Sequence, residues 1–119
     1  MDNNFLENRD LQILKKILSE IKLIENWCVA LDKNLFLEDE LTQRAITMTL
    51  INIGELVKNL SEEIRKQNPN IPWRSISGMR DIAAHKYQTL KIEDVWITIN
   101  SDLLKFKLFL LGLIESELL

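Results

Sequence analysis

The residue types best suited to proton-transfer chemistry are gathered in one stretch of the chain. Residues 80–87 read Arg-Asp-Ile-Ala-Ala-His-Lys-Tyr, and this octet contains the only histidine, His85, and the only tyrosine, Tyr87, of the 119 residues. A free histidine titrates near pH ~6.5, so it can accept and donate protons at neutral pH without a strongly perturbed environment. If the protein performs acid–base chemistry, His85 is the first candidate.

Helical geometry sorts the octet into two neighbouring faces. At about 100° per residue, Asp81 and His85 lie roughly 40° apart, so the carboxylate can orient the imidazole and favour its charged form. Arg80 and Tyr87 fall within roughly 20° of each other on an adjoining face. The two alanines at 83–84 leave room for another element to approach the helix closely, and a second copy of the same helix is one candidate.

Arginine and histidine together suit attack on a phosphodiester without a metal. A guanidinium presents planar donors to phosphate oxygens and stabilises developing charge, while histidine moves the proton. RNA fits this chemistry because its ribose 2′-OH already lies beside the phosphate and supplies the nucleophile. Cleavage by this route needs a base and an acid, so the single His85 favours a symmetric dimer that offers two. A structural role for His85 is the alternative, and the spacing alone leaves it open.

Positive charge is concentrated around the octet. The chain has a net charge of −3, but residues 65–91 hold six basic residues and one acid, a net +5, so the remainder carries −8. The six are Arg65, Lys66, Arg74, Arg80, Lys86 and Lys91. A polyanionic ligand is drawn to such a segment, which makes Arg74, Lys86 and Lys91 candidate RNA-binding residues. Solvation of an ordinary surface is the alternative.

Length and composition predict one small domain over residues 1–119, with 46% hydrophobic residues to build its core. The lone Cys28 allows no internal disulfide and, with one histidine, no cage of several thiolates or imidazoles, so we expect no metal, no cofactor and a reducing, cytoplasmic location. The N-terminus lacks a secretory pattern, and the longest apolar run, 108–114, is far shorter than the roughly 20 residues needed to cross a bilayer. We therefore expect no membrane partner.

The spacing of apolar residues predicts the elements that position the octet. Steps of three and four predict helices over about 8–31, 41–59, 73–86 and 93–116, the third of which carries the octet. Ser61, followed by two glutamates, predicts a cap for a short helical continuation through Ile64, and the prolines of Asn68–Pro72 then break the chain. No segment shows strand alternation. The sequence therefore predicts an all-α fold, an up-and-down four-helix bundle with a short extra helix.

The tryptophans allow two interpretations. Trp73 could stack on a base, but a tryptophan that follows a proline turn at a helix start is more typical of a core. Trp27, Trp96 and Cys28 share the helical spacing of their neighbours, so we interpret them as core or dimer surface.

Several motifs beyond the octet follow one another in a fixed order over nearly half the chain. They are Arg44-Ala45-Ile46, Ile53-Gly54-Glu55, Leu60-Ser61-Glu62-Glu63, Asn68-Pro69-Asn70-Ile71-Pro72-Trp73, Gly78-Met79-Arg80-Asp81 and His85-Lys86-Tyr87. In residues, order and spacing, this stretch resembles the HepT-like branch of the HEPN superfamily, ribonuclease toxins encoded beside minimal nucleotidyltransferase antitoxins. The first and fourth helices are similar to the family only in pattern.

The resemblance implies a HEPN-type bundle that forms a homodimer, in which two Arg-x4-His motifs face one composite cleft. It implies a metal-independent endoribonuclease of a type VII toxin–antitoxin system, leaving a 2′,3′-cyclic phosphate and a 5′-OH. By the same resemblance, Arg80 holds the phosphate, His85 is the general acid/base and Asp81 is the polar residue after the arginine. Tyr87 matches the tyrosine that the partner nucleotidyltransferase modifies with AMP, which adds negative charge and opposes RNA binding.

Two residues depart from the family pattern. Asparagine is frequent after the motif arginine, where this chain has Asp81, whose charge favours the imidazolium of His85 and weakens anion binding. Aspartate is frequent between the histidine and the tyrosine, where Lys86 instead adds attraction for phosphate. Two alternatives to a ribonuclease stay open: a non-catalytic helical subunit that binds a nucleotidyltransferase, and a dimer that binds RNA and leaves it intact.

Overall fold

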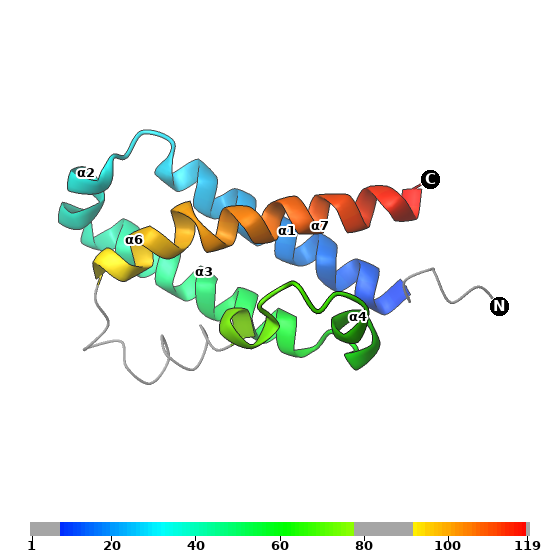
Figure 1. Ribbon diagram of the computed structural model, residues 1–119. Helices are drawn as coiled ribbons and strands as arrows, with labels where there is room; N and C mark the ends of the chain where they lie inside the picture. Colours follow the sequence, from blue (N-terminus) through cyan, green and yellow to red (C-terminus); the bar gives the residue numbers. More distant parts are fainter. Residues whose placement is uncertain (1–7, 78–91, 119) are drawn as a thin grey trace.

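The fold is built from helices of very unequal length (Figure 1). The computed structural model describes residues 8–77 and 92–118. Its helices are α1 (Asn8–Cys28), α2 (Lys33–Glu38), α3 (Glu40–Lys58), α4 (Glu62–Gln67), α6 (Ile92–Asn100) and α7 (Asp102–Leu118), and residues 73–77 are also helical. The described ranges contain no strand, which confirms the all-α prediction, and no helix in them is long and apolar enough to cross a membrane.

One apolar core joins the three long helical segments. It is formed by Leu14, Ile17, Ile21 and Ile24 of α1, by Ile46, Leu50, Ile53 and Val57 of α3, and by Leu103, Phe106 and Leu110 of α7. Each set steps by three or four residues, so each helix presents one apolar face to the others. Burying a side chain of this size stabilises the fold by about 1.5–3 kcal/mol, so the shared face sets the arrangement of the helices. The helix periodicity seen in the sequence is confirmed.

The structure contains a helix that apolar spacing did not predict. The six residues of α2 begin after Asp32, whose carboxylate accepts a hydrogen bond from the backbone N–H of Leu35 at 2.8 Å. Phe36 is the buried side chain of α2, and its ring lies 5.0 Å from that of Trp96 on α6. Six residues are fewer than two turns, which is too short for a hydrophobic period to be recognised.

A carboxylate fixes the corner between α2 and α3. Asp39 accepts hydrogen bonds from the backbone N–H of Thr42 at 3.0 Å and from its hydroxyl at 2.8 Å. These bonds stabilise the charged form, so the pKa of Asp39 lies below its ordinary value. Gln43 donates its amide to the carbonyls of Phe36 and Leu37 at 2.9 and 3.0 Å, which satisfies the end of α2. Asp39 thus caps the start of α3.

The C-terminal helix predicted over about 93–116 is divided at Ser101 into α6 and α7. The Ser101 hydroxyl donates to the carbonyl of Ile97 at 2.7 Å, and the Asn100 amide donates to the carbonyl of Trp96 at 2.8 Å. Such side-chain hydrogen bonds compete with the helical backbone pattern. The pattern nevertheless continues, because Ser101 N–H bonds Ile97 and Lys105 N–H bonds Ser101. The prediction of one helix over about 93–116 was therefore wrong only at Ser101.

A buried carboxylate joins the first turn of α1 to α4. Asp10 is 2% exposed and accepts hydrogen bonds from the backbone N–H of Ser61 at 3.0 Å and from its hydroxyl at 2.5 Å. The same hydroxyl oxygen accepts from the backbone N–H of Ile64 at 3.4 Å, so Ser61 caps α4 as predicted. The helix extends to Gln67, beyond the short continuation expected. Two elements distant in sequence thus meet at one serine.

Ser61→Ala removes a hydroxyl that both caps α4 and solvates the buried carboxylate of Asp10. We expect the free energy of unfolding to fall by about 1.5–3 kcal/mol, the range for a hydrogen bond to a charged group. Urea denaturation measures this change. Ser19→Ala is the matched control, because the Ser19 hydroxyl is exposed and bonds only the carbonyl of Lys16 in its own helix, and its effect should stay within ~0.5 kcal/mol. Equal losses in the two variants would contradict the assignment.

Candidate active site

The octet lies between two segments that the structure describes. Arg80, Asp81, His85, Lys86 and Tyr87 fall within residues 78–91 and so lie outside the described residues, as does Lys91. Among the predicted site residues, Arg74 is described. The structure therefore shows how the chain enters the octet, through residues 68–77, and how it leaves, through α6.

Asn68 organises the entry to the octet. Its carbonyl accepts hydrogen bonds from the backbone N–H of Ile71 at 3.2 Å and from the indole N–H of Trp73 at 2.9 Å. Its side-chain amide donates to the carbonyl of Ile64 at 2.9 Å, near the end of α4. The backbone N–H of Ile76 then bonds the carbonyl of Pro72 at 3.0 Å, which begins the next helix where the proline predicted it.

Trp73 fixes this entry to α7. The indole is 9% exposed and meets two rings of α7 edge to face, Phe106 at 6.0 Å and Phe109 at 5.4 Å between centroids. Such contacts stabilise by about 0.5–1.5 kcal/mol beyond burial, and the indole N–H is satisfied by Asn68. The interpretation of Trp73 as core is confirmed. The direction in which residues 73–77 leave the bundle is consequently fixed by aromatic packing.

The exit from the octet is fixed by the packing of α6. α6 begins at Ile92, which packs partly buried against the core, and Val95 is buried one turn later. Trp96 then packs against Phe36 of α2. Trp96, interpreted as core or dimer surface, thus lies at the edge of the core, whereas Trp27 is one of the exposed large apolar side chains.

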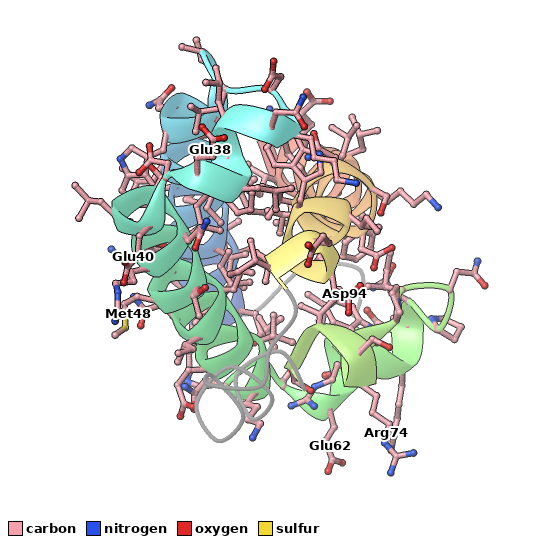
Figure 2. All side chains as sticks on the ribbon, turned by 90° about the vertical axis from the view of Figure 1, so that its left-hand side faces the viewer. Glu38, Glu40, Met48, Glu62, Arg74 and Asp94 are labelled. Carbon is pink, nitrogen blue, oxygen red and sulfur yellow. The ribbon has the colours of Figure 1, made fainter. Side chains whose placement is uncertain are left out.

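The basic residues that precede the octet do not share one role. Arg65 donates its guanidinium to the carbonyls of Lys58 and Leu60 at 3.0 and 2.9 Å, which satisfies the C-terminal end of α3. That bonding makes Arg65 a structural residue, although its charge contributes to the basic segment. Arg74 lies on the exposed side of residues 73–77, and its guanidinium projects away from the bundle (Figure 2). Arg74 is therefore accessible to a phosphate.

Acidic side chains border this region on several helices. Glu62 and Glu63 lie in the first turn of α4, and Glu93 and Asp94 lie in the first turn of α6, where they also complement the helix dipole. All four are exposed. In Figure 2, Glu62 and Arg74 project at the bottom of the view, whereas Asp94 lies near its middle. Attraction of an anion therefore depends on the basic residues of 78–91 as well as on Arg74.

Trp73→Phe tests the entry to the octet, because it keeps an aromatic ring in the core and removes the donor to the Asn68 carbonyl. We expect the free energy of unfolding to fall by about 1–2 kcal/mol. Amide hydrogen exchange should quicken at residues 68–77. Trp27→Phe removes the same indole N–H from a largely exposed side chain and should change stability by less than ~0.5 kcal/mol. Similar effects of both substitutions would contradict the role of Trp73.

Comparison with known proteins relates this arrangement to one family. The model of a family described as "Ribonuclease HepT-like" matches residues 17–112, a range that spans the entry, the octet and the exit. No solved structure matches the chain.

Three curated relatives agree with the family match. A putative RNase of Caldanaerobacter subterraneus subsp. tengcongensis is 33% identical over 90 residues, which is 76% of this chain and 80% of that protein. A probable ribonuclease HepT of Thermococcus cleftensis is 34% identical over 94 residues, 79% and 86% of the two chains. A putative RNase of Methanocaldococcus jannaschii is 36% identical over 88 residues, 73% of each. With a family model that covers most of its length, this chain belongs to the HepT-like ribonuclease family.

Proposed function

We propose that the protein is a metal-independent endoribonuclease, the toxin of a type VII toxin–antitoxin system, which cleaves RNA with Arg80 and His85. The observation that carries the proposal is the family match over residues 17–112, which includes the whole octet. Relatives named as RNases along most of the same range support it. The chemistry of the octet, an arginine for phosphate and a histidine for proton transfer, agrees with that activity.

The reaction needs two histidines in different protonation states. One neutral His85 takes the proton of the ribose 2′-OH, and the 2′ oxygen attacks the adjacent phosphorus. The bond from phosphorus to the 5′ oxygen breaks, and a protonated His85 from the second chain gives that oxygen a proton. The products are a 2′,3′-cyclic phosphate and a 5′-OH. Arg80 stabilises the charge that gathers on the phosphate oxygens, and Asp81 orients the imidazole.

A homodimer supplies the second histidine, and the anchors around the octet support such a composite site. Trp73 ties the entry to α7, and α6 ties the exit to α2 through Trp96. Because both ends of the octet segment are attached to one core, the segment loses less conformational entropy when it contacts the second chain. Its catalytic groups are then better preorganised. Each chain, a single domain, is thus proposed to supply half of the composite active site. The proposed location is the cytoplasm.

Tyr87 is proposed as the point of control. Transfer of AMP to its hydroxyl by a minimal nucleotidyltransferase would add a phosphate charge two residues from His85. The exposed acids Glu93 and Asp94 of α6 follow Tyr87 in the chain and oppose anions, so an added negative charge would further weaken attraction for RNA. The modified protein is expected to bind RNA poorly.

The catalytic assignment predicts RNA cleavage by the purified protein in EDTA, with a 2′,3′-cyclic phosphate at the new end. His85→Ala removes the proton-transfer group and should lower the rate by about 10²–10⁴-fold. Arg80→Ala should also impair cleavage, because it removes the charge that stabilises the phosphate. An Arg9→Ala variant, altered at an exposed arginine of α1, serves as the control and should cleave normally. An inactive wild type would instead favour a non-catalytic subunit.

The composite arrangement is checked in the same assay. Mixing wild type with an excess of His85→Ala should suppress cleavage beyond simple dilution, because mixed dimers hold one histidine instead of two. Activity that only follows the amount of wild type would exclude a shared site.

Arg74 is predicted to contact an RNA phosphate. In a His85→Ala background, Arg74→Ala should weaken RNA binding and reduce the slope of log K against log salt by about 0.7, the value for one phosphate of a single strand. Binding is measured by fluorescence anisotropy over a salt series. Arg9→Ala in the same background is the matched control, and its slope should equal that of the background. Identical slopes for both variants would exclude Arg74 from the RNA surface.

A further inference from the structure

The outward face of α3 carries one continuous stripe of side chains. At about 100° per residue, six positions of α3 fall within roughly 80° of one another. Ile51 is half-buried and the other five are exposed. Figure 2 shows two of them, Glu40 and Met48, along the same outer edge of the helix. We define the α3 stripe as Glu40, Arg44, Met48, Ile51, Glu55 and Lys58.

The order of residue types along the α3 stripe is self-complementary. From the N-terminal end it runs acid, base, apolar, apolar, acid, base. A second copy that runs in the opposite direction therefore sets every acid against a base and the two apolar residues against each other, whereas a parallel copy in register sets like charges together. The matched pairs share one centre, at residues 49–50. They are Glu40 with Lys58, Arg44 with Glu55, and Met48 with Ile51.

This match is the one that a two-fold contact between identical chains requires. In such a contact the same patch serves both copies, so that residue i of one copy meets residue j of the other, and j meets i. Each pair of the α3 stripe obeys this rule and occurs twice in the dimer. The complementarity is thus to the chain itself rather than to an acidic or a basic partner in general.

The ends of the α3 stripe are charged and its centre is apolar. Met48 is 58% exposed, and Leu41, 80% exposed, flanks the stripe. An apolar centre with a polar rim is the usual composition of a protein interface, and methionine adapts its shape to a partner. Glu40 and Arg44 form an ion pair within the helix, with 2.9 Å between Oε1 and Nη2. Since a carboxylate accepts about four hydrogen bonds and a guanidinium donates about five, this pair can also bond the opposite charges of a second copy.

The described attachments of the octet lie toward opposite ends of α3. The entry follows α4, where Arg65 bonds the carbonyls of Lys58 and Leu60 at the C-terminal end of α3. The exit packs through Trp96 on Phe36 of α2, the helix that precedes α3. An antiparallel pair of α3 helices therefore sets the entry side of each copy beside the exit side of the other, so the attachments of both octets come together in one dimer.

We propose that the α3 stripe binds the α3 stripe of a second copy in the antiparallel direction, and that this pair is the homodimer in which the composite ribonuclease site forms. Packed helices lie about 8–10 Å apart, so Met48 of each copy contacts Ile51 of the other. The pairing depends on α3 itself, whereas its catalytic role rests on the proposed function.

Sedimentation equilibrium and RNA cleavage, measured on the same samples, test the proposal. Met48→Glu places a charge at the apolar centre, so we expect the mass to fall to that of one chain. Cleavage per chain should fall by about 10²-fold or more, as when a proton-transfer group is lost. Leu108→Glu is the matched control, because Leu108 is similarly exposed, 62%, but lies on α7, and its mass and cleavage should equal those of wild type. A dimeric Met48→Glu, a monomeric wild type, or an equal loss of mass in Leu108→Glu would overturn the pairing.

The pairing and the ribonuclease activity can fail separately in this experiment. If the wild type is dimeric and Met48→Glu is monomeric, but neither cleaves RNA, the pairing is supported and the proposed ribonuclease function fails. If Met48→Glu is monomeric and cleaves RNA as fast as the wild type, the α3 pair is not the catalytic dimer, and that part of the proposal is overturned.

A charge exchange tests the direction of the pairing. Lys58→Glu sets two carboxylates against each other at both ends of the dimer, so its dissociation constant should rise by about tenfold. Adding Glu40→Lys exchanges the two charges and should return the constant to near the wild-type value. Glu40→Lys alone should weaken the dimer, so recovery in the double variant separates the pairing from the loss of a single charge. An unchanged constant for Lys58→Glu, or no recovery in the double variant, would overturn the antiparallel register.

Discussion

The hydrogen bond from the indole of Trp73 to the carbonyl of Asn68 is the contact that holds the segment leading into the octet. One donor closes the proline-containing turn after α4, while the same ring packs edge to face against Phe106 and Phe109 of α7. The turn after α4 and the packing on α7 are coupled, because both depend on the rigid side chain of Trp73. The position of residues 73–77 is thus determined by the same core that holds α1, α3 and α7 together.

Most of the scaffold follows from local patterns in the sequence. The apolar periods of α1 and α3, the caps at Asp39 and Ser61 and the break at Asn68–Pro72 all act within a few residues, so they can be recognised without a structure. The short α2 and the bend at Ser101 could not, because they depend on six residues packing through Phe36 and on side-chain hydrogen bonds that compete with the backbone. Tertiary packing decides the first, and local side-chain hydrogen bonds decide the second.

The candidate site, too, could be predicted from the sequence only in part. Residue types and the family resemblance identify the octet, and the family match includes it. Charge counting, in contrast, cannot distinguish a guanidinium that closes a helix end, as Arg65 does, from one exposed to a ligand, as Arg74 is. Nor could the sequence show that the acids of α4 and α6 that flank the basic segment are exposed. The roles proposed for Arg80, His85 and Tyr87 are based on their side-chain chemistry and on the resemblance to the family.

The continuity of backbone hydrogen bonds through Ser101 has a structural consequence. Because the bonds from Ser101 to Ile97 and from Lys105 to Ser101 bridge the bend, the backbone pattern of α6 continues into α7. The point where the octet rejoins the bundle, at Ile92, is therefore connected through hydrogen-bonded helix to the part of α7 that packs against α1.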